Sequence, residues 1–185
     1  MTLRVFLAIP IPEVVQRGLR ELQSGVPGAR WSLTEQIHLT LRFIGDVDGR
    51  KLDLISENLR SLDFEPFMLE LEGTGYFPSS GPARVLWAGV LPCNELMDLQ
   101  SQLERRLVEA AGLERERRNF HPHVTLARLG KVHEAKVRNW LEYSGGFAAQ
   151  DPFRVDSFGL YSSILSPQGA KYQLLEEFPC CGEIL

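Results

Sequence analysis

Two short segments of this sequence pair a histidine with a threonine in the same way. His38-Leu39-Thr40 and His123-Val124-Thr125 each open a stretch of the form H-x-T-L-x-x-x-G-x-V. On a β-strand, residues two apart point to the same face, so each motif presents an imidazole beside a hydroxyl. A histidine changes charge near neutral pH, so one imidazole can accept a proton while its twin donates one. Threonine hydroxyls between them can donate hydrogen bonds to phosphate oxygens, and the combination predicts phosphoryl transfer without a metal.

The repetition favours chemistry over packing as the reason for these residues. A single histidine on a strand is more often structural, and Thr40 and Thr125 alone could be β-branched strand formers. A duplicated core has a packing reason to keep leucine and glycine, but none to keep an imidazole beside a hydroxyl. We therefore take His38 and His123 as candidate catalytic residues, and the two threonines as candidate phosphate-binding residues.

Two arginines close to the motifs are further candidates for binding substrate. Arg42 lies four residues after His38, so strand alternation places it on the same face. Arg128 lies five residues after His123, so it needs a bulge or the end of the strand to reach that face. Each arginine either contacts phosphate or lies on a solvated surface.

A metal site is the rival interpretation of the second motif. His121 and His123 are two residues apart and could both ligate zinc, but no further ligand stands at a recognisable spacing from them. We therefore expect neither a metal nor a cofactor, with His121 as a mere neighbour of His123.

Nucleic acid is a candidate partner, although the overall composition does not suggest it. The 20 lysines and arginines against 24 aspartates and glutamates leave a formal charge of −4, so local cations must hold any anionic ligand. Arg115, Arg117 and Arg118, just ahead of the second motif, form either a solvated segment or a contact for a nucleic-acid backbone. The aromatic residues that could stack on bases are Trp31, Phe43, Tyr76, Phe77 and Tyr161.

The elements that position the motifs repeat as well. Each half of the chain has the pattern strand, helix, strand, helix, strand, which predicts an α+β fold. We expect one domain with two pseudo-symmetric lobes, each an antiparallel sheet flanked by helices, and an active-site cleft between them. The lobes are the repeats of about residues 1–82 and 83–185, and strand exchange between them is left open. The expected elements are 3–9, 13–25, the His38 strand, 49–62 and 67–71, then 84–91, 94–111, the His123 strand, 134–143 and 153–157.

Composition places the chain among soluble globular proteins. With 185 residues and 44% hydrophobic residues it is large enough to bury a core of its own. The apolar run at residues 5–11 is interrupted by Pro10 and is too short to span a membrane. The three cysteines of the chain do not have the regular spacing of a disulfide framework, so we expect them to be reduced thiols. We expect a cytoplasmic monomer.

At these motifs the sequence resembles a known family, the two-histidine (2H) phosphoesterases. It is most similar to the LigT-like RNA 2′,3′-cyclic phosphodiesterases, also called 2′-5′ RNA ligases of the ThpR type. The likeness extends over nearly the whole chain, and the segments that carry it are 4–9, 38–45, 83–87 and 122–128. It implies a bilobal fold and the hydrolysis of a 2′,3′-cyclic phosphate on RNA, tRNA fragments included, to a 2′-phosphate without a metal.

The resemblance also implies a role for each matching residue. His38 would protonate the departing 3′ oxygen and His123 would accept a proton from water, while Thr40, Thr125 and Arg128 would bind the phosphate. The resemblance also implies reversible 2′-5′ RNA ligation, in which forming a 2′-5′ linkage is the microscopic reverse of cleaving one. Two alternatives stay open: a cyclic phosphodiesterase acting on a small nucleotide such as an ADP-ribose derivative, and a non-catalytic RNA-binding module.

Overall fold

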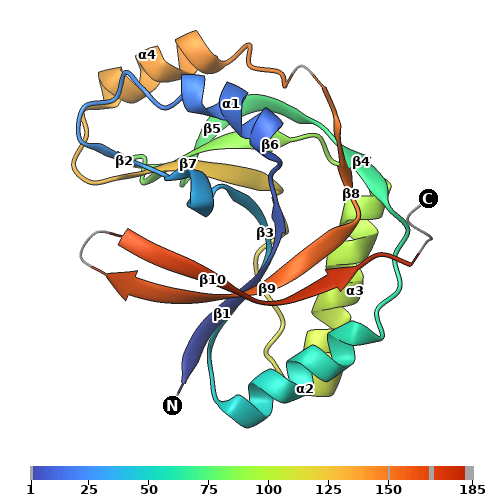
Figure 1. Cartoon of the computed structure of the whole chain (residues 1–185). Coiled ribbons are helices and arrows are strands. Elements are labelled where there is room, and N and C mark those ends of the chain that lie inside the picture. Colours follow the sequence, from blue (N-terminus) through green and yellow to red (C-terminus); the bar gives the residue numbers. More distant parts are fainter. Residues whose placement is uncertain (1, 150, 167–168, 182–185) are drawn as a thin grey trace.

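The computed structural model describes residues 2–149, 151–166 and 169–181, and these form an α+β fold (Figure 1). None of its helices is long and apolar enough to cross a membrane, within the residues described. In chain order the elements are β1 (Leu3–Pro10), α1 (Glu13–Glu21), β2 (Ala29–Trp31), the 3-10 helix η1 (Thr34–Gln36), β3 (His38–Val47), α2 (Gly49–Arg60), β4 (Phe67–Leu69), β5 (Leu71–Phe77), β6 (Val85–Val90), α3 (Asn94–Ala111), β7 (His123–Leu129), α4 (Glu134–Ser144), β8 (Phe153–Val155), β9 (Ser157–Ser166) and β10 (Gly169–Pro179).

The larger sheet has the two motif-bearing strands at its centre. Its strands follow the order β10-β9-β1-β3-β7-β6-β5, with β2 as an additional neighbour of β7, and neighbouring strands are antiparallel. The strands that carry the two His-x-Thr motifs, β3 and β7, therefore lie side by side in the middle. They share a single registered pair, Leu39 with Val124, so the two halves of the sheet separate on either side of this contact.

Strands from each half of the sequence pair with strands from the other half. β5 precedes β6 in the chain and extends the β6-β7 half, whereas β9, far along the chain, pairs with β1. The segments expected to be single closing strands at 67–71 and 153–157 are in fact divided. Their first parts, β4 and β8, pair with each other in a separate two-stranded sheet.

The helices are distributed over both halves of the sheet. Figure 1 shows α1 and α4 together beside β5, β6 and β7, and α2 with α3 beside the β1-β9-β10 half. A hydrogen bond of 2.8 Å from Trp140 Nε1 to the carbonyl of Leu22 joins α4 to the end of α1. In each half of the sheet, the helices thus pack against the face that carries the apolar side chains, as the sequence pattern predicts.

Helix α3 illustrates how closely periodicity fixes an element here. Leu96, Leu99, Leu103 and Leu107 recur at helical spacing and are all at most 2% exposed. The helix ends at Gly112, whose φ of +59° is left-handed and costs glycine little. These features place the helix at the residues expected from the sequence.

Candidate active site

The register of the two central strands brings the motifs together. Because Leu39 pairs with Val124 in antiparallel fashion, His38 lies opposite Thr125 and Thr40 lies opposite His123. Leu39 and Val124 are fully buried in the core, so the four polar side chains occupy the other face of the sheet. We call this the histidine face. The two His-Thr pairs thus lie on adjacent strands and on one face, where a single phosphate group could contact both.

Each imidazole is held by the backbone two residues before it. His123 Nδ1 lies 2.7 Å from the carbonyl oxygen of His121, to which it donates its proton. The backbone of Gln36 accepts a hydrogen bond from the His38 ring in the same way. His38 Nε2 lies 3.1 Å from Thr40 Oγ1, so in the neutral ring the threonine hydroxyl donates to this nitrogen. The Nε2 atoms are thus the ones left for proton transfer.

Burial shifts the titration of both imidazoles. It lowers the pKa of His38 to about 4, with smaller contributions from the charges of His123 and Arg128, although the Gln36 carbonyl partly offsets this. Burial also lowers the pKa of His123, helped by the charges of His121 and Arg128 and opposed by the His121 carbonyl. Both rings are therefore mainly neutral at pH 7 in the free protein, and a bound anion would favour protonation of one of them.

Aromatic rings surround both imidazoles. The His38 ring lies 4.9 Å from the Phe6 ring and 5.2 Å from the Tyr172 ring, between centroids. The His123 ring lies 4.9 Å from Phe77 and 6.4 Å from Trp87. Sequence reasoning missed Phe6, Tyr172 and Trp87 as parts of the site, because only the strand order brings their strands beside the motifs.

The five aromatic candidates for base stacking divide into two groups. Phe43 and Tyr161 both stack on Phe6, which places them on the histidine face with Phe77, and Phe43 is 47% exposed. Trp31 instead packs against Trp140 of α4. Tyr76 faces α4, where it lines a separate pocket. Stacking of a base on Phe43 stays a prediction.

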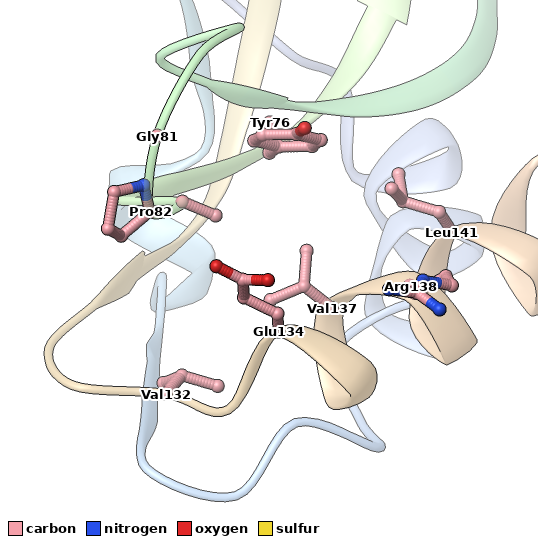
Figure 2. Close-up of a pocket in the computed structure, with 9 residues that line it drawn as sticks. Tyr76, Gly81, Pro82, Val132, Glu134, Val137, Arg138 and Leu141 are labelled. Carbon is pink, nitrogen blue, oxygen red and sulfur yellow. The ribbon is translucent and has the colours of Figure 1, made fainter.

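That pocket lies outside the histidine face. It has a volume of about 290 Å³ and lies between the end of β5 and helix α4. Figure 2 shows the Tyr76 ring on one side and the Glu134 carboxylate and Val137 on the other. Neither His38 nor His123 lines this pocket. Tyr76 and Phe77 are neighbours on β5 and point to opposite faces, so Tyr76 lines the pocket whereas Phe77 contacts His123 on the histidine face.

Arg42 does not lie where strand alternation places it. The pairing of β1 with β3 shifts between Leu7 and Ala8, which leaves an extra residue in β3 just before Arg42. Phe43 consequently takes the place on the histidine face, and the Arg42 guanidinium turns towards α3. The expectation that Arg42 shares the face of His38 is therefore wrong.

The Arg42 guanidinium is occupied by protein groups. Its Nε atom lies 2.7 Å from a carboxylate oxygen of Glu104, and both side chains are almost buried. Its terminal nitrogens donate to the Glu116 carboxylate at 3.0 Å and to the carbonyl of Glu114 at 2.7 Å. Arg42 thus fixes the segment between α3 and β7 rather than offering a free cation to a phosphate.

Arg128 reaches the histidine face through a corresponding bulge. The pairing of β6 with β7 shifts between Leu86 and Trp87, so Leu126 is the extra residue and the alternation changes after it. Its charge lowers the pKa of both histidines, which places it near both rings. This is the bulge that the sequence analysis required for Arg128 to approach a phosphate.

The arginine-rich segment before β7 is exposed and held beside β3. Arg115, Arg117 and Arg118 make no ion pair with any residue that the structure describes. The segment's backbone is anchored through Glu116, whose amide donates to Glu104 Oε1 at 2.6 Å. Contact between these arginines and a nucleic acid remains a prediction.

His121 contributes its carbonyl to the site, and its ring lies 6.4 Å from that of His123. Within the described part of the chain, no group of three or more His, Cys, Asp or Glu side chains is arranged to hold a metal ion. The described residues thus place no third His, Cys, Asp or Glu ligand beside His121 and His123.

A two-lobed α+β fold in which two His-x-Thr strands meet is the arrangement of the two-histidine phosphoesterases. The model of the LigT-like phosphoesterases matches residues 9–87 and 91–172. The chain belongs to this family.

Similarity to named relatives and to a solved structure supports this family assignment. An RNA 2′,3′-cyclic phosphodiesterase of Archaeoglobus fulgidus is 33% identical over 180 residues, covering 95% of this chain and 99% of the relative. That of Thermotoga maritima is 35% identical over 181 residues, with 95% and 94% covered. Among solved structures, E. coli LigT complexed with 3′-AMP has a TM-score of 0.80 at 26% identity, with 98% of this chain and 100% of that chain covered.

Proposed function

We propose that this protein hydrolyses a terminal 2′,3′-cyclic phosphate on RNA to a 2′-phosphate, using two histidines as acid and base without a metal. The observation that carries the proposal is the register of Leu39 with Val124, which gathers both His-Thr pairs on one face. The names of the relatives supply the substrate class, since several are RNA 2′,3′-cyclic phosphodiesterases at about a third identity over most of this chain.

In the proposed reaction the cyclic phosphate lies over the two motifs. His123 Nε2 takes a proton from a water molecule, whose oxygen forms a new bond to phosphorus. The bond from phosphorus to the 3′ oxygen breaks, and protonated His38 gives its Nε2 proton to that oxygen. The products are a 3′ hydroxyl and a 2′-phosphate, with the protonation states of the two rings exchanged. The same sequence, with a 5′ hydroxyl in place of water, would form a 2′-5′ linkage, and its reverse would cleave that linkage and re-form the cyclic phosphate.

The low pKa of His38 is compatible with its role as the acid. A weakly basic imidazole is a strong acid once it is protonated, and the negative charge of a bound phosphate stabilises that protonated form. Thr40 is already within hydrogen-bond distance of His38 Nε2, and Thr125 lies across from it. Their hydroxyls and Arg128 would hold the phosphate oxygens, where charge changes during the reaction.

We extend the proposal to RNA ends that include tRNA fragments, and to a cytoplasmic monomer. Its two halves, about residues 1–82 and 83–185, would act as repeats that each supply one His-x-Thr pair.

The test measures turnover of a short oligoribonucleotide that ends in a 2′,3′-cyclic phosphate, beside a cyclic mononucleotide, with excess EDTA present. We expect hydrolysis in EDTA, and a loss of about 100-fold or more in His38→Ala and in His123→Ala, the range for removing general acid–base catalysis. Near wild-type turnover in either folded variant would refute the two-histidine mechanism. Loss of activity in EDTA that a divalent ion restores would instead support a metal bound by His121 and His123.

A further inference from the structure

Strand β2 places an arginine directly beside Arg128. In the antiparallel pairing of β2 with β7, Arg30 is registered opposite Arg128, and both residues are exposed. Directly opposed residues in such a pair point to the same face, so their side chains are neighbours. Like charges in this position destabilise a sheet. The pair therefore needs an explanation other than folding.

In the part of the chain that the structure describes, no carboxylate forms an ion pair with either guanidinium. The chain as a whole carries more acidic than basic residues, so carboxylates are not scarce. Two unpaired arginines on adjacent strands are suited to an external anion, because a guanidinium offers a planar set of donors that matches phosphate oxygens.

The backbone that presents Arg30 is firmly held. Ser32 follows β2, and its amide donates to the carbonyl of Leu126 at 2.8 Å while its hydroxyl donates to the carbonyl of Thr125 at 3.0 Å. Gln23 Nε2 in turn donates to the carbonyl of Ser32 at 2.9 Å. β2 is thus attached to the same stretch of β7 that carries the phosphate-binding Thr125, as Figure 1 also shows for the two strands.

The position of Arg30 differs from that of Arg128 in one respect. Arg128 lies on β7 three residues after Thr125 and its charge lowers the pKa of both histidines, whereas Arg30 lies on the neighbouring strand β2, opposite Arg128. Arg30 is therefore on the same face of the sheet but outside the two His-Thr pairs. An anion bound between the two arginines would lie next to the reacting phosphate without replacing it.

We propose that Arg30, together with Arg128, binds a second phosphate of the substrate: the phosphodiester that joins the terminal nucleotide to its neighbour. This inference rests on the proposed function, and it makes the protein selective for an oligonucleotide over a cyclic mononucleotide. The second phosphate contributes binding that a mononucleotide with a free 5′ hydroxyl lacks. The same contact makes binding of the longer substrate more sensitive to salt.

The test compares Arg30→Gln with the wild-type protein on two substrates. One is a 2′,3′-cyclic mononucleotide with a free 5′ hydroxyl, and the other is a trinucleotide with the same terminal base and cyclic phosphate. We expect kcat/KM for the trinucleotide to fall about tenfold in Arg30→Gln, and that for the mononucleotide to fall far less. The dependence of log(kcat/KM) for the trinucleotide on log salt should lose about one unit of slope, the effect of one phosphate contact.

A matched control is Arg154→Gln, since Arg154 is exposed on β8 of the small sheet. It should leave both substrates unaffected. Thermal melting separates a structural role from a binding role, because removal of one of two opposed like charges should leave the melting temperature of Arg30→Gln equal to or above that of wild type.

The outcomes distinguish this inference from the function on which it rests. A wild-type protein that hydrolyses neither substrate overturns the proposed function and this inference with it. Normal wild-type hydrolysis combined with an unchanged trinucleotide rate in Arg30→Gln overturns the inference alone. Equal losses on both substrates, or a lowered melting temperature, would place Arg30 at the reacting phosphate or in the fold and would likewise overturn it.

Discussion

The ion pair between Arg42 and Glu104 allows a sharp test of how the site is supported. Arg42→Met removes a guanidinium whose Nε lies 2.7 Å from Glu104, and the two side chains are only 10% and 11% exposed. Breaking one side of a buried ion pair typically costs about 3–5 kcal/mol, because the remaining charge stays unpaired. Glu104 keeps a hydrogen bond from the Glu116 amide. We therefore expect a loss of about 3 kcal/mol in the free energy of unfolding, at the lower end of that range.

For a chain of this length, this loss corresponds to a fall of roughly 6–12 °C in Tm. Urea unfolding followed by circular dichroism measures the free energy, and calorimetry measures Tm. The double variant Arg42→Met with Glu104→Leu should recover most of the loss, because it removes both charges from the interior. Arg60→Met is a matched control, since Arg60 also pairs with a glutamate, Glu176, but on the surface, and its removal should change stability little.

Two outcomes would refute this reasoning. One is an Arg42→Met variant within about 1 kcal/mol of wild type, the range expected of an exposed ion pair. The other is a double variant as unstable as the single one, which would mean that lost packing rather than the stranded carboxylate causes the effect.

Three further predictions concern the histidine face. The pKa values of both histidines are lowered from 6.5, so the singly protonated enzyme is most populated below pH 6.5 and kcat/KM should be low above that pH. Arg128→Gln removes a charge that lowers both pKa values, so it should move the fall in kcat/KM to higher pH. A kcat/KM profile that stays flat to pH 8 would contradict the assignment. Thr40→Val and Thr125→Val should each lower kcat about five- to 150-fold with the fold intact, and the corresponding serine variants, which keep the hydroxyl, should lose less activity. Equal activity of the valine and serine variants would mean that the threonines are only strand formers. Gly75→Ala would place a Cβ 2.2 Å from the Trp87 ring, so it should displace that ring and cost about 1–3 kcal/mol, and an unchanged Tm would contradict this.

The repeated motif made the central part of the site predictable from sequence. A period of two on each strand is enough to place an imidazole and a hydroxyl on one face, and the shared pattern indicates that both strands belong to the same site. What sequence could not supply is the direct contact between the strands. The pairing of Leu39 with Val124 is a long-range contact, and no local propensity encodes it.

The arginines show where strand alternation fails. A bulge adds one residue and reverses the face of everything after it, and nothing in the local residue types marked the bulge before Arg42. A signal was nevertheless present in the alignment of the two repeats. Arg42 aligns with Ala127, which is fully buried, whereas Phe43 aligns with Arg128. The bulge falls at the same place in both repeats, so once the structure puts Arg128 on the histidine face, the alignment puts Phe43 rather than Arg42 there as well.

Strand β2 was missed for a different reason. Its three residues are too few to show any period, and their position depends on pairing with β7 far along the chain. The sequence alone therefore could not predict that Arg30 lies beside Arg128. Short strands of this kind are found only through their partners.

The near symmetry of the fold and the asymmetry of the chemistry have separate sources. Two equivalent strands supply two equivalent imidazoles, but an acid and a base must differ in protonation at the same moment. The surrounding side chains provide that difference. His38 lies between the rings of Phe6 and Tyr172 and is neutral in the free protein, so in the proposed reaction it becomes the acid only when a bound phosphate stabilises its protonated form, whereas His123 lies beside His121, whose charge opposes protonation of His123. At the sixth position of the repeats, one strand has an aromatic ring and the other a guanidinium. A symmetric substrate site would bind a phosphate equally in two orientations, so in the proposed reaction these differences would favour one orientation and one direction of proton transfer.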